Sequence, residues 1–140
     1  MVRHYLLAII MLMVAWLASP VMASQSANSL VQLKRELIAR GLPAQAFDQA
    51  YAYYQCAYHA GAIHNPKLSI VNFSQPSYQN RMYVIDMVKH RLLFDIRVAH
   101  GEYSGNVYAT RFSDKAGSRE SVLGAMLTGT SYYGHFGHSL

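Results

Sequence analysis

The sequence is poor in cysteine and in charged residues, and each shortage excludes a class of protein. Its one cysteine, Cys56, cannot form an internal disulfide, so no disulfide framework holds the fold. Only 14% of the residues are charged while 12% are aromatic, and this balance excludes a disordered chain. No internal repeat, low-complexity segment or linker is visible. We therefore predict that the chain after its N-terminal segment forms one small globular domain.

Common catalytic and metal-binding motifs are missing as well. There is no H-E-x-x-H or C-x-x-C, and no serine lies in a G-x-S-x-G turn. The acidic residues are dispersed, which excludes a recognisable carboxylate pair, and the loop from Gly101 to Gly105 has no helix behind it to bind phosphate. The H-x-x-H pair, His135 and His138, lacks further ligands, so we interpret both as polar surface or groove residues. We expect no metal and no cofactor.

The N-terminus has the three-part pattern of a secretory signal peptide. Arg3 gives a basic start, an apolar run extends from Leu6 to Ala18, and a helix-breaking Ser-Pro pair and small residues follow. We predict that residues 1–23 are a signal peptide cleaved after Ala23. The alternative is an uncleaved anchor, but the run is shorter than the ~20 residues of a spanning helix. No later segment is apolar enough to span, so we expect export to the periplasm or cell envelope without a stable membrane anchor.

The chain is basic, with a net charge of +5, and loss of Arg3 with the signal peptide leaves a basic excess. A basic surface favours anionic surroundings such as a cell wall or acidic lipid. Export argues against nucleic acid as a partner. Because the basic residues are scattered, a solvated surface is the alternative explanation of any one of them.

Residues 24–61 are predicted to form a helical hairpin. The first helix has leucines at helical spacing, namely Leu30, Leu33 and Leu37. Asn28 or Ser29 is available as its N-cap and Gly41 as its stop, while Pro43 suits the start of the second helix. The second helix has an apolar stripe at steps of three and four: Phe47, Ala50, Tyr51, Tyr54, Ala57 and Tyr58.

Cys56 falls inside this second helix. A nucleophilic cysteine needs a lowered pKa, from a helix N-terminus, a metal or a nearby cation, and Cys56 is far from the helix start. His59, three residues later, leaves a Cys–His pair open as an alternative. Free cysteine is among the most buried residue types, so we interpret Cys56 as a small buried residue.

Residues 62–140 are predicted to form an antiparallel β-sheet. Turn residues separate four expected strands, at residues 68–71, 81–86, 92–99 and 121–127. Met87 to His90 is predicted to connect the second strand to the third as a hairpin. The glycine-rich end of the chain is expected to be irregular. Helices followed by strands predict an α+β domain with the helices on one side of the sheet.

Three stretches of this second half resemble a known family. The first runs from Asn65 to Ser74 and on through Arg81–Asp86 (RMYVID). The second joins Val98–Gly101 (VAHG) to Ser104-Gly105 and Tyr108–Ser113 (YATRFS). The third joins Ser121–Gly129 (SVLGAMLTG) to Tyr132-Tyr133-Gly134 and Gly137–Leu140 (GHSL). Together they resemble the murein L,D-transpeptidase catalytic-domain family of exported bacterial proteins.

The resemblance implies a largely β domain that acts on peptidoglycan stem peptides. In that family a cysteine attacks the peptide, a histidine serves as base and backbone N–H groups bind the oxyanion, which is a general arrangement for acyl transfer. The resemblance implies four substrate-groove candidates: Gly101, Arg111, Ser121 and Gly124. Arg111 would help to hold a carboxylate, with a solvated surface arginine as the alternative. Ser121 and Gly124 would lie on the strand that lines the cleft.

The catalytic pair does not carry over. The family places its histidine and its S-x-G-C cysteine after the G-x-S-L segment, within which these 140 residues end. We assign no catalytic residue, because Cys56 and His100 lie in other regions. We therefore expect a helical hairpin followed by an incomplete, mainly antiparallel L,D-transpeptidase-like β-domain, with residues 121–127 along an open, aggregation-prone edge. Two hypotheses follow: a transpeptidase-like protein that is inactive alone, and a non-catalytic envelope module that binds peptidoglycan.

Overall fold

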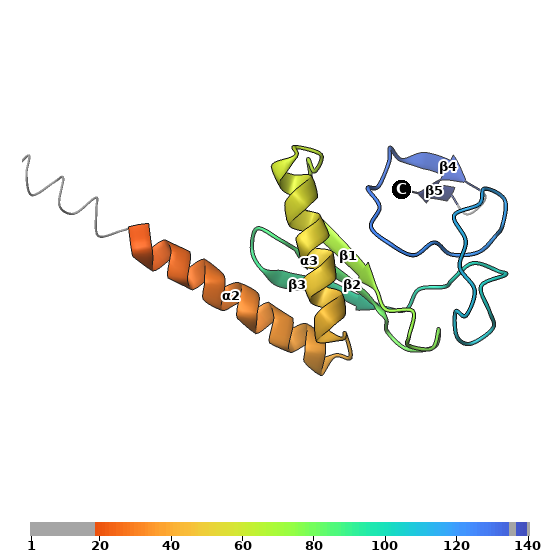
Figure 1. The fold of residues 1–140 in the computed structure, drawn as a ribbon, viewed down its shortest axis with the longest axis horizontal. Coiled ribbons are helices and arrows are strands. Elements are labelled where there is room, and N and C mark those ends of the chain that lie inside the picture. The colour runs from red at the N-terminus through yellow and green to blue at the C-terminus, as the bar shows by residue number, and fades with distance from the viewer. Residues whose placement is uncertain (1–18, 135–136, 140) are drawn as a thin grey trace, which may run out of the picture.

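The computed structural model describes residues 19–134 and 137–139, and it contains two helices followed by five strands (Figure 1). The helices are α2 (Ser19–Ala39) and α3 (Ala44–His59). The strands are β1 (Lys67–Val71), β2 (Met82–Asp86), β3 (Arg91–Ile96), β4 (Tyr132–Gly134) and β5 (Gly137–Ser139). This order confirms the α+β class, with antiparallel sheets of three and two strands.

Helix α2 begins earlier than predicted. The expected N-cap at Asn28 or Ser29 is wrong, because the helix already includes Ser19 and Pro20. Ser19 and Pro20, which were predicted to break a helix, are both part of α2. The predicted signal core, Leu6–Ala18, lies outside the described residues. Within the described part of the chain, no helix has the length and hydropathy needed to cross a membrane.

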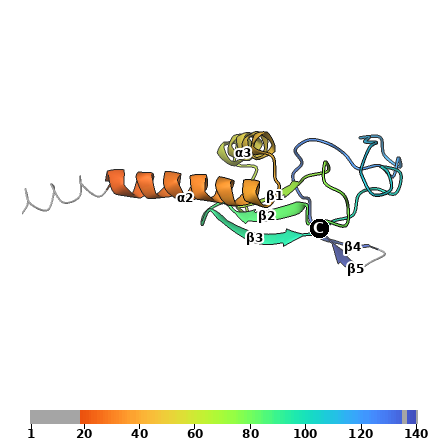
Figure 2. The same ribbon diagram turned by 90° about the horizontal axis from the view of Figure 1, so that it is seen from below.

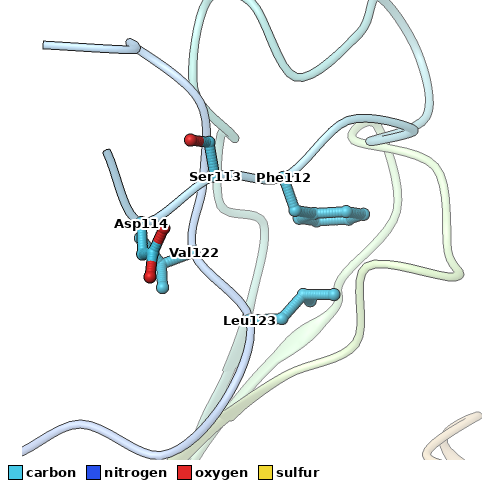
Figure 3. Close-up of a pocket in the computed structure, with 5 residues that line it drawn as sticks. All are labelled: Phe112, Ser113, Asp114, Val122 and Leu123. Carbon is cyan, nitrogen blue, oxygen red and sulfur yellow. The ribbon is translucent and has the colours of Figure 1, made fainter. Parts of the chain in front are cut away.

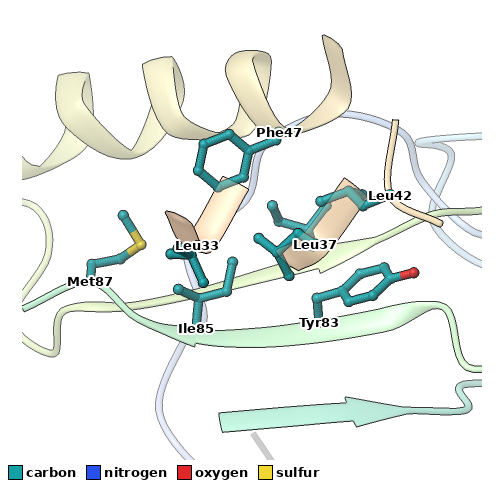
Figure 4. Close-up of a cluster of buried hydrophobic side chains, with 8 residues drawn as sticks. Leu33, Leu37, Leu42, Phe47, Tyr83, Ile85 and Met87 are labelled. Carbon is teal, nitrogen blue, oxygen red and sulfur yellow. The ribbon is translucent and has the colours of Figure 1, made fainter. Parts of the chain in front are cut away.

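Both helices pack on one face of the three-stranded sheet, in the order β1-β2-β3 (Figure 2). The predicted leucine spacing of α2 is confirmed, because Leu33 and Leu37 are buried and Leu30 packs against the core. The side chains that meet between the helices and the sheet form one cluster (Figure 4): Leu33, Leu37, Leu42, Phe47, Ile70, Tyr83, Ile85 and Met87.

The predicted stripe of α3 is confirmed as far as Tyr54, since Ala50, Tyr51 and Tyr54 pack against the core. Phe47 is buried and stacks on Tyr51, whereas Tyr58 is 53% exposed near the helix end. The interpretation of Cys56 as buried is wrong, because its side chain is exposed. Because an α-helix turns by about 100° per residue, Cys56 lies on the face of α3 opposite Phe47 and the apolar stripe, where it meets solvent.

Polar contacts tie the end of α2 to the sheet. Gly41 has a φ of 97° and ends the helix as predicted, since this left-handed conformation suits glycine. The hydroxyl of Tyr83, a fully buried residue of β2, donates to the carbonyl of Arg40 at 2.8 Å. The amide of Asn72 donates to the carbonyl of Gly41 at 3.1 Å. These bonds hold the helical hairpin against the sheet.

Two expectations for the last third of the chain are wrong. Residues 121–127 form no strand, because only Ser121 makes a bridge, to Phe112, and the residues after it are exposed. Strand formation depends on a paired neighbour, and no described segment pairs with residues 122–127. The glycine-rich end is not wholly irregular, since β4 and β5 pair as a short antiparallel ladder.

Asp86 is expected to make the stability of the domain pH-dependent. Its carboxylate accepts from the backbone N–H groups of Lys89 and Val88 and from the Lys67 ammonium, each at 3.1 Å. These contacts, led by the Lys89 N–H, hold the pKa of Asp86 below its ordinary value. The unfolded chain therefore binds the proton first, so this stabilisation is complete above about pH 4 and is lost as the pH falls through the folded pKa.

The pH dependence can be measured by urea unfolding at neutral and acidic pH. Wild-type protein should lose more stability on acidification than Asp86→Asn. Asp48→Asn is the matched control, because Asp48 is exposed and pairs only with Lys34. An Asp86→Asn protein with the wild-type acid sensitivity would contradict the assignment.

Candidate functional site

Residues 98–121 bring two distant segments together beyond the end of β3. The backbone N–H of Gly101 donates to the hydroxyl of Ser121 at 2.9 Å. The backbone N–H of Ser121 in turn donates to the hydroxyl of Ser104 at 2.7 Å, and Ser104 is fully buried. We call Gly101, Ser104 and Ser121 the junction. It unites two of the four groove candidates, Gly101 and Ser121.

Only glycine fits at position 101, because the junction has no room for a side chain there. An added Cβ would lie 2.4 Å from the carbonyl oxygen of Arg119 and 2.8 Å from both the carbonyl carbon of Glu120 and the nitrogen of Ser121. All three are backbone atoms, which cannot turn aside as a flexible side chain does. The two segments can approach this closely only because the residue has no side chain.

Ser104 organises the turn that follows Gly101. Its N–H donates to the carbonyl of Gly101 at 2.9 Å, and its own carbonyl accepts from the N–H groups of Thr110 and Arg111 at 2.8 and 2.9 Å. Sequence reasoning placed Ser104 in one of the family-like stretches but did not predict this structural position. The Ser104-Gly105 pair was the available signal, because Gly105 adopts a φ of 150° and its Cβ would lie 2.1 Å from the Tyr108 carbonyl oxygen.

Arg111 lies at the edge of the junction and binds its own chain. Its Nε donates to the carbonyl of Tyr103 at 2.7 Å, and Nη2 donates to the same oxygen. Glu120 lies 3.5 Å from Nε, and the Arg111 side chain is 64% exposed. The guanidinium therefore braces the loop and keeps part of its surface open to solvent, where an anion could reach it.

Gly124 is not part of the junction. Its φ of 116° suits glycine, but an added Cβ would meet nothing within 4 Å. Its role in this structure is conformational, since it lets the exposed segment after Ser121 change direction.

A shallow pocket of about 240 Å³ lies beside the Phe112–Ser121 bridge (Figure 3). It is lined by Phe112, Ser113, Asp114, Val122 and Leu123. Pockets for drug-sized ligands measure roughly 300–1,000 Å³, so this one suits a single side chain or a short part of a peptide. Its surface combines apolar side chains with one carboxylate and one hydroxyl.

The histidines in the described part of the chain are not gathered into a metal site. His138 packs against Tyr133 with ring centroids 5.2 Å apart, and His59 packs edge-on against Tyr58 at 6.1 Å. His135 lies outside the described residues. In residues 19–134 and 137–139, no three His, Cys, Asp or Glu side chains are grouped to hold a metal ion. His100 is held close to the junction instead, by a buried arginine, Arg81.

The family model described as L,D-transpeptidase catalytic domain matches residues 38–140, which include α3, all five strands, the junction and the pocket. No curated protein and no solved structure matched the chain.

Proposed function

Because this chain belongs to the L,D-transpeptidase catalytic-domain family, we propose that it is an exported transpeptidase-like protein of peptidoglycan crosslinking or remodelling, whose partners are stem peptides and whose 140 residues are inactive alone. The family match supports peptidoglycan as the partner. The three-part N-terminal pattern supports export to the periplasm or cell envelope.

One observation carries the proposal. The hydrogen bonds of the junction are formed, but the junction contains no nucleophile with an adjacent base. Acyl transfer through a covalent intermediate needs a nucleophile activated by an adjacent base. The hydroxyl of Ser104 is fully buried and accepts from Ser121. The Nδ1 atom of His100 faces a guanidinium, so it cannot serve Ser121 as a base. These groups can position a peptide but cannot attack it.

Cys56 is in a different part of the molecule. It is exposed on α3, which covers the sheet, whereas the chain after β3 lies to one side of α3 in both views (Figures 1 and 2). A thiol in this position has no access to the groups that surround Ser121. The only cysteine of the chain is therefore not its transpeptidase nucleophile.

Crosslinking assays with the 140-residue protein test this reading of Cys56. Incubation with purified stem peptides is expected to give no new crosslinked product, and Cys56→Ala is expected to behave as wild type does. Liquid chromatography with mass spectrometry measures the products. Crosslinking by the wild-type protein that disappears in Cys56→Ala would refute the proposal.

A second candidate is a non-catalytic envelope module, favoured by exposed tyrosines around the junction and at the chain end: Tyr103, Tyr108, Tyr132 and Tyr133. Tyrosine offers contact area at a low cost in side-chain entropy and is common at binding surfaces. Such a module would bind sacculi regardless of any transpeptidase partner.

Retention on purified sacculi measures this binding. Wild-type protein is expected to be retained at low ionic strength, and Tyr108→Ala, which removes a side chain that is 49% exposed, should weaken retention several-fold. Tyr53→Ala is the matched control, since Tyr53 is 60% exposed on α3. No retention of the wild-type protein would exclude this candidate.

A further inference from the structure

Arg81 is a fully buried cation without an acidic partner. Its Nε and Nη2 atoms donate to the carbonyl of Val98 at 3.1 and 2.9 Å, and Nη1 donates to the carbonyl of Gln75 at 2.9 Å. Its guanidinium carbon lies 5.3 Å from the ring centroid of Phe73. All seven acidic residues of the chain lie in the described part, and none comes within 4 Å of Arg81. Burial lowers the pKa of Arg81.

This arginine holds one imidazole in a defined state. Nη2 of Arg81 lies 2.8 Å from Nδ1 of His100. A guanidinium can only donate, so Nδ1 must accept and the ring proton must be on Nε2. Nε2 lies 3.2 Å from the carbonyl oxygen of Gly105, to which it donates. His100 is therefore a neutral bridge with an acceptor toward Arg81 and a donor toward Gly105.

The bridge connects the sheet to the junction. On one side, the backbone of Arg81 is fixed just before β2, since its N–H donates to Ile96 and its carbonyl accepts from Asn72. On the other side, Gly105 directly follows Ser104, and the hydroxyl of Ser104 accepts from the N–H of Ser121. The position of Ser121 relative to the sheet thus depends on His100.

Stability alone does not explain a charged residue here. Removing a guanidinium from water is unfavourable, and an apolar side chain of similar volume often serves a buried site as well or better. What an apolar side chain cannot supply is a planar fork of donors, which here orients two backbone carbonyls and one imidazole together. The arrangement therefore suits the positioning of these groups better than it suits stabilisation of the fold.

We propose that Arg81 and His100 are positioning residues that set the place of Ser121 and of the pocket-lining segment after it. That this segment receives a stem peptide rests on the proposed function. The positional claim itself rests only on the contacts of Arg81, His100, Gly105 and Ser104. Neither residue is expected to touch the reacting atoms.

Amide hydrogen exchange, measured by nuclear magnetic resonance on the 140-residue protein, tests the claim. His100→Phe keeps a ring but removes both the acceptor and the donor, so exchange at Ser121 should rise about tenfold, as expected for loss of one hydrogen bond. His100→Gln keeps one acceptor and one donor and should restore protection to within about threefold of wild type. The amides of Leu37 and Ile85 should be unchanged in both variants.

Equal protection of Ser121 in wild type, His100→Phe and His100→Gln would overturn the proposal. Equal loss of Ser121 protection in both variants would also overturn it. Glutamine supplies the acceptor and the donor, so its failure to restore protection would mean that His100 acts only by filling space. If His100→Phe loses protection at Leu37 and Ile85, Arg81→Lys provides the test. Lysine keeps the charge without the fork, so faster exchange at Ser121 with an intact core is expected, and unchanged exchange would refute the proposal.

Sacculus retention separates this inference from the proposed function. Faster exchange at Ser121 in His100→Phe, together with no retention of wild-type protein, would support the positional role and reject the peptidoglycan ligand. Retention of wild-type protein with equal exchange in all variants would support the ligand and reject the positional role.

Discussion

Alanine at position 101 is expected to separate the two segments of the junction and to lower the free energy of unfolding by about 3 kcal/mol. The new Cβ would lie 2.4 Å from the Arg119 carbonyl oxygen and 2.8 Å from the Ser121 nitrogen. Relief requires the backbone at 119–121 to move away, which also breaks the bond between the Gly101 N–H and the Ser121 hydroxyl. Urea unfolding measures the loss, and sacculus retention should fall with it.

Gly129→Ala is the matched control for this substitution. A Cβ at Gly129 would meet nothing within 4 Å, and its backbone is not in the left-handed region, so the change should lie within about 0.5 kcal/mol of wild type. If Gly101→Ala and Gly129→Ala are equally stable, the close approach of residues 101 and 121 is wrong.

Leu37→Ala is expected to have the largest effect on stability, about 2–5 kcal/mol. Leu37 is fully buried between the two helices and the sheet, in the same cluster as Phe47 and Tyr83 (Figure 4). Truncation leaves a cavity that the surrounding rigid elements cannot close. Since domains are stable by only about 5–15 kcal/mol, a loss of this size leaves much of the protein unfolded on mild heating. Thermal and urea unfolding both measure it.

The neighbouring residue provides the control. Ile38 is 42% exposed on the same helix, so Ile38→Ala should cost less than about 1 kcal/mol. A Leu37→Ala protein no less stable than Ile38→Ala would show that α2 does not pack on the sheet. The helical hairpin would then be separate from the β-domain, and the contact of Tyr83 with Arg40 would not form.

Local patterns predicted the first two-thirds of the fold well. The leucine spacing of α2, its stop at Gly41 and the hairpin between β2 and β3 all depend on residues close in sequence. The prediction of a strand over residues 121–127 was wrong because a strand also needs a partner, and only Ser121 has one. The expected burial of Cys56 was wrong for a different reason: it relied on the usual burial of free cysteine, whereas the helical period places Cys56 on the face opposite Phe47 and the core.

The candidate site divides in the same way. The resemblance of VAHG and SVLG to the family selected Gly101 and Ser121, and the family match supports that resemblance. No spacing in the sequence connects these residues to Ser104, or connects Arg81 to His100. Those pairs are brought together by the path of the chain after β3, and hydrogen bonds form only where the folded backbone places donor and acceptor about 3 Å apart.

The sequence by itself determined the two helices, the α+β class, the family and the lack of a cysteine in the second half of the chain. These follow from periodicity, turn residues and residue identity, all of which act over short stretches. Only the tertiary structure decided that Gly101 has no room for a side chain and that Arg81 is buried without an acid. Burial and steric contact depend on which distant segments meet, and that is a property of the whole packed chain.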